Sequence, residues 1–294
     1  MPSFALLAGI TFNGIAMGLT YALLSMGLIL VIRATGVLNF SLGDIVSIGG
    51  YVTFWVFITH NIPIFPGMFL ALIIFAFTGV LFMFVTYIPV RNNKWTQTRN
   101  VCTMGASVII TQLLPMLTTY TTRAMNSPIQ GALRIGLASI QYHYMLIFGV
   151  CLITMLITYI LFDKLYVGRA MMAAAQNAYA AELIGIPTMV TIASTYMIVF
   201  CVVGIAGWLI VPTFVLSTSL SLFQTRAFAG CVIGGFGDLR GALLGSIVIG
   251  LVESYAILVT SLYKDIIVYM LLLTILAVKP DGLFASKNRI GVKV

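Results

Sequence analysis

The chain alternates between long apolar runs and short polar connections. Nine runs reach or approach the roughly twenty apolar residues that a membrane-spanning helix needs: residues 8–32, 40–59, 66–88, 101–121, 143–162, 189–211, 222–237, 241–262 and 264–279. The seventh run is short and glycine-rich. It is either a crossing or a broken or re-entrant helix, which a membrane tolerates only where protein or a cavity surrounds it. The pattern predicts an all-α polytopic bundle of eight or nine transmembrane helices.

Composition points to the same class. Hydrophobic residues make up 61% of the 294 residues and charged residues only 7%, whereas soluble domains carry about 25% charged residues. No water-soluble fold could bury this much apolar surface, so we expect a single transmembrane domain over residues 1–294. The net charge of +8 does not indicate a nucleic-acid partner, because the basic residues lie between the apolar runs.

The basic connections predict the orientation in the membrane. Cytoplasmic connections of membrane proteins carry an excess of Lys and Arg. We therefore place three segments in the cytoplasm and the 122–142 connection outside, while the side of the N-terminus depends on whether residues 222–237 cross. The basic residues concerned are Arg91, Lys94, Arg99, Lys164, Arg169, Lys279, Lys287, Arg289 and Lys293.

Residues 167–186 are not apolar enough to cross a membrane, although they lie between two apolar runs. The segment is rich in Ala, which favours helix, and it closes with Gly185, Ile186 and Pro187. Gly at this place stops a helix, and Pro187 cannot continue the same one. Because small side chains let another protein approach closely, we interpret residues 168–186 as a docking helix and the chain as part of a larger assembly.

Glycines recur near the C-terminal end of the sequence. Gly237, Gly241 and Gly245 form a GxxxGxxxG pattern, and Gly230 and Gly234 add another pair. On a continuous helix these positions share a face and allow close backbone approach of a neighbouring helix. They predict packing within the chain, or a subunit interface or pore-lining surface; the two are not exclusive.

Polar residues interrupt the apolar runs at two places. Residues 36–44 contain Asn39, Ser41 and Asp44, which indicate either a broken-helix element on the transport path or a short turn with Asp44 starting the next helix. Glu253 lies inside the run 241–262. It lines a pathway, carries protons, or forms a structural ion pair with Arg226 or Arg240.

Enzyme signatures are missing from the sequence. No Gly-Lys-Ser/Thr, HExxH or GxSxG string occurs, so neither an ATP site nor a hydrolase is expected. The four cysteines, Cys102, Cys151, Cys201 and Cys231, have no CxxC spacing. We therefore predict neither a disulfide nor a metal site.

Five stretches together resemble a known family. They are residues 14–28, 36–44, 168–186, 228–245 with Gly250 and Glu253 following, and 279–284. In this order, over nearly the whole chain, they are similar to the branched-chain amino acid ABC transporter permeases of the LivH type. The chain departs from that pattern at Ser41-Leu42, where the family usually has Ala-His. Its docking loop is also poor in acids, with Glu182 alone and Gln176 and Asn177 where charge is common.

The resemblance implies a permease subunit of an ATP-driven importer for branched-chain or other small amino acids, working by alternating access in a bacterial-type cytoplasmic (inner) membrane. It implies a second permease, two ATPase subunits that bind the ATP, and an external solute-binding protein, with no cofactor on this chain. A permease for urea or short amides, a stand-alone proton-coupled carrier using Glu253 or Asp44, and a channel-like or structural scaffold remain alternatives. We expect the ATPase-coupling contact to include Gly168, Arg169, Ala174, Ala181, Glu182 and Gly185.

Overall fold

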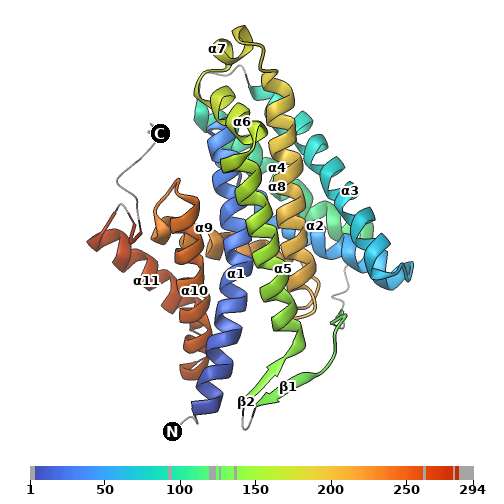
Figure 1. Cartoon of the computed structure of the whole chain (residues 1–294), viewed down its shortest axis with the longest axis vertical. Coiled ribbons are helices and arrows are strands. Elements are labelled where there is room, and N and C mark those ends of the chain that lie inside the picture. The colour runs from blue at the N-terminus through green and yellow to red at the C-terminus, as the bar shows by residue number, and fades with distance from the viewer. Residues whose placement is uncertain are drawn as a thin grey trace. The chain divides into compact units, whose positions relative to one another are not determined.

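The computed structural model describes residues 4–91, 95–118, 124–125, 127–135, 138–260, 263–280 and 282–284 (Figure 1). Lys94, Lys287, Arg289 and Lys293, used above for the orientation, lie outside these residues. Seven helical stretches of the described part are long and apolar enough to cross a membrane, which confirms the all-α polytopic class. They cover Leu7–Thr35, Leu42–Thr59, Ile64–Val90, Gln97–Leu117, Tyr142–Lys164, Thr188–Ile210 and Leu239–Leu258.

The other two predicted spans are shorter helices. Helix α9 (Phe223–Gly234) has 12 residues and α11 (Lys264–Val278) has 15, which at 1.5 Å per residue makes them about 18 and 22 Å long. The hydrocarbon core of a bilayer is about 30 Å thick. By length and composition, the described residues thus hold seven spanning helices where the sequence predicted eight or nine. Residues 222–237 form a short helix and a turn.

The chain divides into two compact units. Unit 1 takes the described residues within 4–29, 127–155 and 223–284, and unit 2 those within 30–125 and 156–222. Helix α1 (Phe4–Thr35) and helix α5 (Tyr142–Tyr159) begin in unit 1 and end in unit 2. The single transmembrane domain expected from the sequence stays a prediction.

Unit 1 is held together by close helix packing. The first part of α1 lies along α10 (Leu239–Val259), and α9 and α11 pack against α10 and against each other (Figure 1). A Cβ added to Gly18 would lie 2.7 Å from the Cα of Ile247, so a side chain there would separate α1 from α10. Ser25 on α1 donates a 2.7 Å hydrogen bond to the carbonyl of Ala227 on α9.

A β-hairpin lies in the 122–142 connection, where the sequence analysis expected no strand. Strands β1 (Ala132–Ile135) and β2 (Ala138–Gln141) pair antiparallel, with Ala132 opposite Gln141. Helix α5 begins directly after β2 at Tyr142. The hairpin therefore leads the chain into the next predicted span.

Unit 2 is built around α8 (Thr188–Ile210), which packs against α2 (Leu42–Phe54) and α3 (Ile64–Phe82). Aromatic rings fill the contact with α3, where the ring centroids of Phe82 and Phe200 are 5.2 Å apart. Three further helices belong to this unit. They are α4 (Thr96–Thr118), α6 (Tyr166–Gln176) and α7 (Ala178–Leu183). π-Helical turns at Trp55–Thr59, Met83–Tyr87 and Ile160–Lys164 extend α2, α3 and α5, and 3₁₀ turns occupy Ile88–Val90 and Thr218–Leu222.

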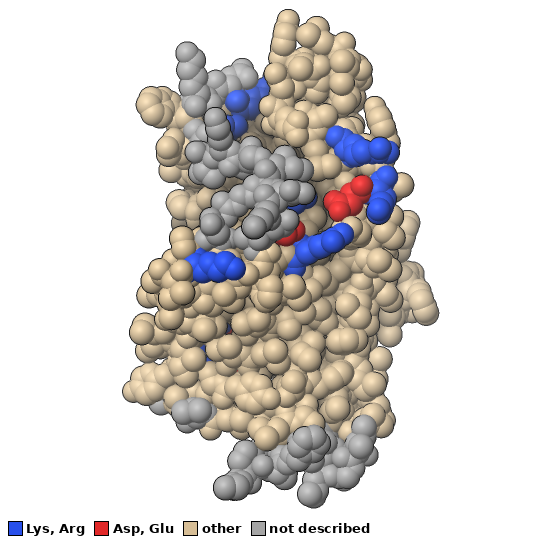
Figure 2. Space-filling model, turned by 60° about the vertical axis from the view of Figure 1, so that its left-hand side comes forward, with Lys and Arg blue, Asp and Glu red and all other residues tan. Residues whose placement is uncertain are grey.

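Much of the protein's surface suits lipid. On the face drawn in Figure 2, charged side chains are few, and most of the surface of the described residues is uncharged. Helix α3 exposes Phe65, Phe69 and Phe77, which recur at helical spacing on one side. An exposed apolar stripe of this kind is expected where a helix meets acyl chains.

Candidate functional site

The predicted docking helix consists of two helices. We call residues 166–186, with α6 and α7, the docking segment. Asn177 separates the helices in an extended conformation (φ −154°, ψ 99°), and its side-chain oxygen accepts a 3.0 Å hydrogen bond from the backbone N–H of Ala180. Asn often leaves the helical conformation to cap a helix N-terminus in this way. The Ala-rich composition predicted the helical content, whereas the break depends on this one side chain.

A glycine-dependent motif closes α7. The N–H of Gly185 donates to the carbonyl of Glu182 at 3.0 Å, and the N–H of Ile186 donates to the carbonyl of Ala181 at 2.9 Å, which is the Schellman arrangement. Gly185 has φ +83°, a conformation that residues with a Cβ rarely adopt. The Glu182 carboxylate accepts a hydrogen bond from the hydroxyl of Thr188 at the start of α8. Helix α7 is therefore tied directly to α8.

One side of the docking segment is buried against its own chain. Ala170, Ala174, Ala181 and Ile186 form a small apolar cluster, and a Cβ on Gly168 would overlap the backbone of Phe162. Of the six predicted coupling residues, Gly168, Ala174 and Ala181 are thus buried within the chain itself. Their small size lets the segment fold onto itself.

The opposite side of the docking segment is open and contains large apolar side chains. Arg169, Glu182 and Gly185 are exposed. Beside them in sequence are four side chains that the sequence analysis missed: Tyr166, Tyr179, Leu183 and Ile184 are each more than 70% exposed. Large apolar residues in an otherwise Ala-rich, non-spanning segment were the signal that could have identified them. Such a surface is typical of a site that another protein covers.

The five glycines lie on two helices and the turn between them, because the chain reverses direction after Gly234. Gly237 lies in that turn with φ +96°, so the GxxxGxxxG pattern does not form one helix face. Gly234 on α9 and Gly241 on α10 meet so closely that a Cβ on either would overlap the other's carbonyl. Gly230 and Gly245 lie at the same crossing. These contacts are all within the chain, and a subunit interface at this place stays a prediction.

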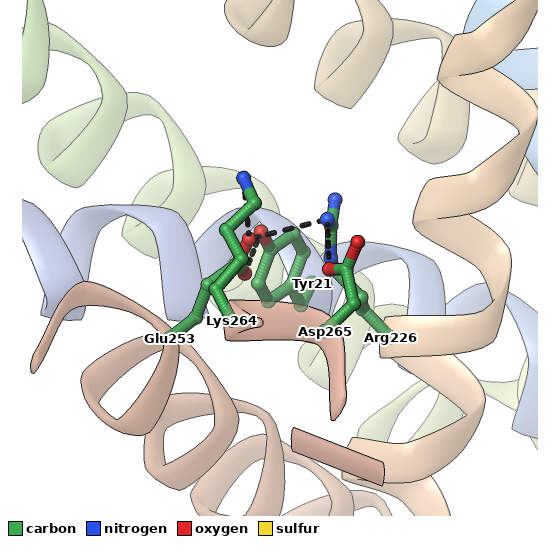
Figure 3. A network of polar contacts seen from close by, with 5 residues as sticks. All are labelled: Tyr21, Arg226, Glu253, Lys264 and Asp265. Atoms are coloured by element: carbon green, nitrogen blue, oxygen red, sulfur yellow. Dashed lines mark hydrogen bonds and ion pairs between the residues drawn. The ribbon is translucent and has the colours of Figure 1, made fainter. Parts of the chain in front are cut away.

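Glu253 is buried and lies in a charge network, drawn in Figure 3, which we define as Tyr21, Arg226, Glu253, Lys264 and Asp265. Asp265, at the edge of the network, is half exposed. The Tyr21 hydroxyl donates to Oε2 of Glu253 at 2.6 Å. The other oxygen, Oε1, lies 3.3 Å from Nη2 of Arg226 and 3.6 Å from Nζ of Lys264. Arg226 also donates to Oδ1 of Asp265 at 2.7 Å. The network joins α1, α9, α10 and α11.

The charge network contains two cations and two carboxylates, so its charges balance. Of the partners considered from the sequence, the structure pairs Glu253 with Arg226, and it adds Lys264 and Asp265. Releasing one partner of a buried pair leaves an uncompensated charge, which is strongly unfavourable. The geometry favours a structural role for Glu253, and its assignment to the translocation path stays a prediction.

The other predicted path residues lie together in unit 2. Helix α1 ends at Thr35, and the side-chain oxygen of Asn39 accepts a 3.0 Å hydrogen bond from the N–H of Ser41, directly before α2. Asp44 is in the first turn of α2. The segment is therefore a turn with Asp44 at the start of the next helix, one of the two alternatives drawn from the sequence. All three side chains are buried.

Helix α4 provides the polar surroundings of this turn. The side-chain oxygen of Asn100 accepts from the N–H of Leu38 at 3.1 Å, and the hydroxyl of Thr111 donates to Oδ1 of Asp44 at 2.8 Å. Asp44 is only 2% exposed. A carboxylate is thus held within an apolar helix, with hydroxyl groups beside it.

Comparison with known proteins gives the family. Residues 10–276 match the family described as branched-chain amino acid transport system / permease component. The chain belongs to this family. The match reaches all seven spanning helices of the described residues, and it includes both helices that carry the buried carboxylates.

Individual relatives match over almost the whole chain. The high-affinity branched-chain amino acid transport system permease protein LivH of Escherichia coli K12 is 30% identical over 92% of this chain and 93% of its own, as is LivH of Salmonella typhimurium. The corresponding protein BraD of Pseudomonas aeruginosa is 27% identical over the same shares. A chain of PsaBC from Streptococcus pneumoniae, solved in complex with Fab, aligns with 90% of this chain and 89% of its own at 14% identity and a TM-score of 0.47.

The protein is therefore a permease subunit of a multi-component ABC importer. It is a transport subunit and not an enzyme. Like the LivH permeases, it is a multi-pass protein of the inner membrane.

Proposed function

We propose that this permease moves branched-chain or other small amino acids through the membrane by alternating access, powered by two separate ATPase subunits. The observation that carries the proposal is the docking segment. Its exposed apolar side chains need a protein partner, and it lies outside the spanning helices. The relatives named above are branched-chain amino acid permeases, which supports the solute class.

The ATPases would cover the exposed side of α6 and α7. Because α7 is joined to α8 by the Schellman closure and by the Glu182–Thr188 hydrogen bond, a displacement of α7 would pass to α8. Helix α8 packs on α2 and α3, so the displacement would reach the spanning helices of unit 2. ATP would be bound by the ATPases, and this chain would need neither an ATP site nor a cofactor of its own.

A second permease, homologous or identical, would lie along α4. Within the apolar part of this helix only 6% of the residues are buried by the chain itself, against 28% to 94% for the other spans. Its exposed side includes Gln112, an amide whose donors and acceptor hydrocarbon cannot satisfy. A neighbouring helix of the second permease would supply those hydrogen bonds.

Reconstituted uptake tests this function. Proteoliposomes would contain this permease, its partner permease and the ATPases, with the solute-binding protein outside and ATP inside. We expect leucine uptake that requires ATP and is lost without the ATPases. Uptake of urea without uptake of leucine would keep the importer and assign urea as its solute. Uptake without ATPases that an uncoupler abolishes would replace the importer by a proton-coupled carrier.

A further inference from the structure

Two carboxylates are buried within the described spans, and they differ in their partners. Glu253, in unit 1, has Arg226 and Lys264 within 4 Å and the Tyr21 hydroxyl at 2.6 Å. Asp44, in unit 2, is even more deeply buried. None of the ion pairs found among the described residues includes Asp44. The fold thus neutralises one buried acid and not the other.

The atoms around Asp44 also lack hydrogen-bond partners. Oδ1 accepts from Thr111, whereas Oδ2 is fully buried without a partner in the described structure. The hydroxyl oxygen of Ser47 is buried and unpartnered as well, and the hydroxyls of Ser41 and Ser107 lie beside the carboxylate. Ser41 and Ser47 are three positions before and after Asp44, on the same side of the chain. Since buried polar atoms are nearly always hydrogen-bonded to protein or ordered water, the cluster leaves acceptor atoms that a ligand can use.

We propose that Asp44, Ser41, Ser47 and Thr111 form the binding site for the primary ammonium group of the transported amino acid. This inference rests on the proposed function. An ammonium group brings one positive charge and three N–H donors. One unpaired carboxylate oxygen and two hydroxyl oxygens match those donors, and charge-assisted hydrogen bonds of this kind are strong.

The site also distinguishes between solutes. Urea and short amides are neutral and would leave the Asp44 charge uncompensated, and an isolated buried charge is very unfavourable. An amine compensates the charge while it passes. Among the solute classes expected for this kind of permease, the site therefore selects amino acids.

Uptake by an Asp44→Asn variant tests the site in the complete reconstituted transporter. The amide keeps the size of the side chain and removes its charge. We expect the rate of leucine uptake to fall at least about tenfold, since losing one charge-assisted contact of about 1.5–3 kcal/mol corresponds to roughly a 10- to 150-fold effect. Asp163→Asn, which changes an exposed carboxylate at the end of the α5 span, is the control and should transport as the unmodified protein does.

The outcomes separate the two proposals. If the unmodified transporter takes up no leucine, the proposed function fails. If it takes up leucine and Asp44→Asn does so within twofold of the same rate, the ammonium site is wrong, and a protonated or purely structural Asp44 is indicated.

A second variant is needed if Asp44→Asn gives no folded complex. Ser47→Ala removes one hydroxyl acceptor and keeps the charge. We expect its KM for leucine to rise severalfold with a smaller change in maximal rate. An unchanged KM would overturn the site.

A matched pair of ligands tests the ammonium group directly. Leucine methyl ester carries the amine, and methyl 4-methylpentanoate is the same molecule without it. With the permease–ATPase complex and no binding protein, millimolar leucine methyl ester should raise the unfolding temperature and the amine-free ester should not. Equal shifts with both esters, or none with either, would contradict the proposal.

Discussion

Arg226 holds the carboxylates of Glu253 and Asp265 at 3.3 and 2.7 Å, while its own side chain is only 10% exposed. These three charges come from three helices that are separate in sequence. Taking charges out of water is unfavourable, and removing one partner of a buried pair costs about 3–5 kcal/mol. The stability of unit 1 therefore depends on this side chain.

We expect Arg226→Met to lower the free energy of unfolding by about 3–5 kcal/mol, because it leaves Glu253 buried with only the more distant Lys264. Thermal unfolding of the purified permease in detergent measures the effect. Lys264→Gln is the matched control. Its 3.6 Å contact involves a side chain that is 25% exposed, so a loss under about 1 kcal/mol is expected. Equal unfolding temperatures for Arg226→Met and the unmodified protein would contradict the structural role of the charge network.

The sequence could predict part of this chemistry. An acid in an apolar run needs a partner, and Arg226 was one of the two considered for Glu253. Lys264 and Asp265 were not considered, because nothing in the sequence places the connection after α10 beside α9. Ser41 was named beside Asp44, whereas the Thr111 hydroxyl was missed for the same reason, since it comes from another helix.

Among the elements, the hairpin of α9 and α10 has the closest backbone contact that a substitution can test. Gly234→Val places a branched side chain against the carbonyl of Gly241, and forcing the helices apart should cost at least about 1–3 kcal/mol. The yield of monodisperse protein and its unfolding temperature should both fall. Gly105→Ala on α4, where nothing lies within 4 Å of the added Cβ, should leave both unchanged. Similar behaviour of the two variants would mean that the crossing is not tight.

Closure of α7 gives a second prediction at this scale. Gly185→Val puts a β-branched residue at φ +83°, which costs roughly 1–2 kcal/mol locally and should displace the end of α7 from α8. We expect uptake to fall severalfold while the protein still inserts and the assembly still hydrolyses ATP. Asn tolerates this conformation better than other residues, so Gly185→Asn should retain most of the uptake. Normal uptake by Gly185→Val would exclude a coupling role for this closure.

The spanning helices could be predicted from the sequence because each corresponds to a long apolar run. Seven spans begin and end within a few residues of the predicted ones, since burial in a membrane requires about twenty apolar residues whatever the neighbours are. The β-hairpin was missed because its four-residue strands give no clear alternation. The prediction that the five glycines share one helix face was wrong, because a turn at Gly237 interrupts the assumed helix.

At the scale of the whole molecule, α4 is the helix that the chain leaves most exposed. If the second permease covers it, Gln112→Leu should reduce recovery of the tagged second permease severalfold, because an interhelical hydrogen bond worth about 0.6–2 kcal/mol is lost. Met116→Leu, one turn along the same side and already apolar, should have no effect. Undiminished recovery with Gln112→Leu would place the second permease elsewhere.

The class of the molecule followed from composition alone, and its family from motifs spread along the chain. Neither composition nor motifs predicted which helices belong to which unit. Unit 1 collects the first helix, the middle hairpin and the last helices, and only packing determines which distant segments meet.

The packing of α1 on α10 also sets an order of events during synthesis. About 220 residues separate Gly18 from the start of α10, which at roughly 5–20 residues per second takes about 10–40 s to translate. Until then the side of α1 that carries Gly18 has lipid or the insertion machinery for a neighbour. Unit 2 consists of two segments from the middle of the chain, 30–125 and 156–222. Both segments are synthesised before α10, so unit 2 can pack earlier. Chains truncated before residue 239 and inserted into the membrane should therefore hold a protease-resistant unit 2, while residues 4–29 of α1 have not yet packed against α10.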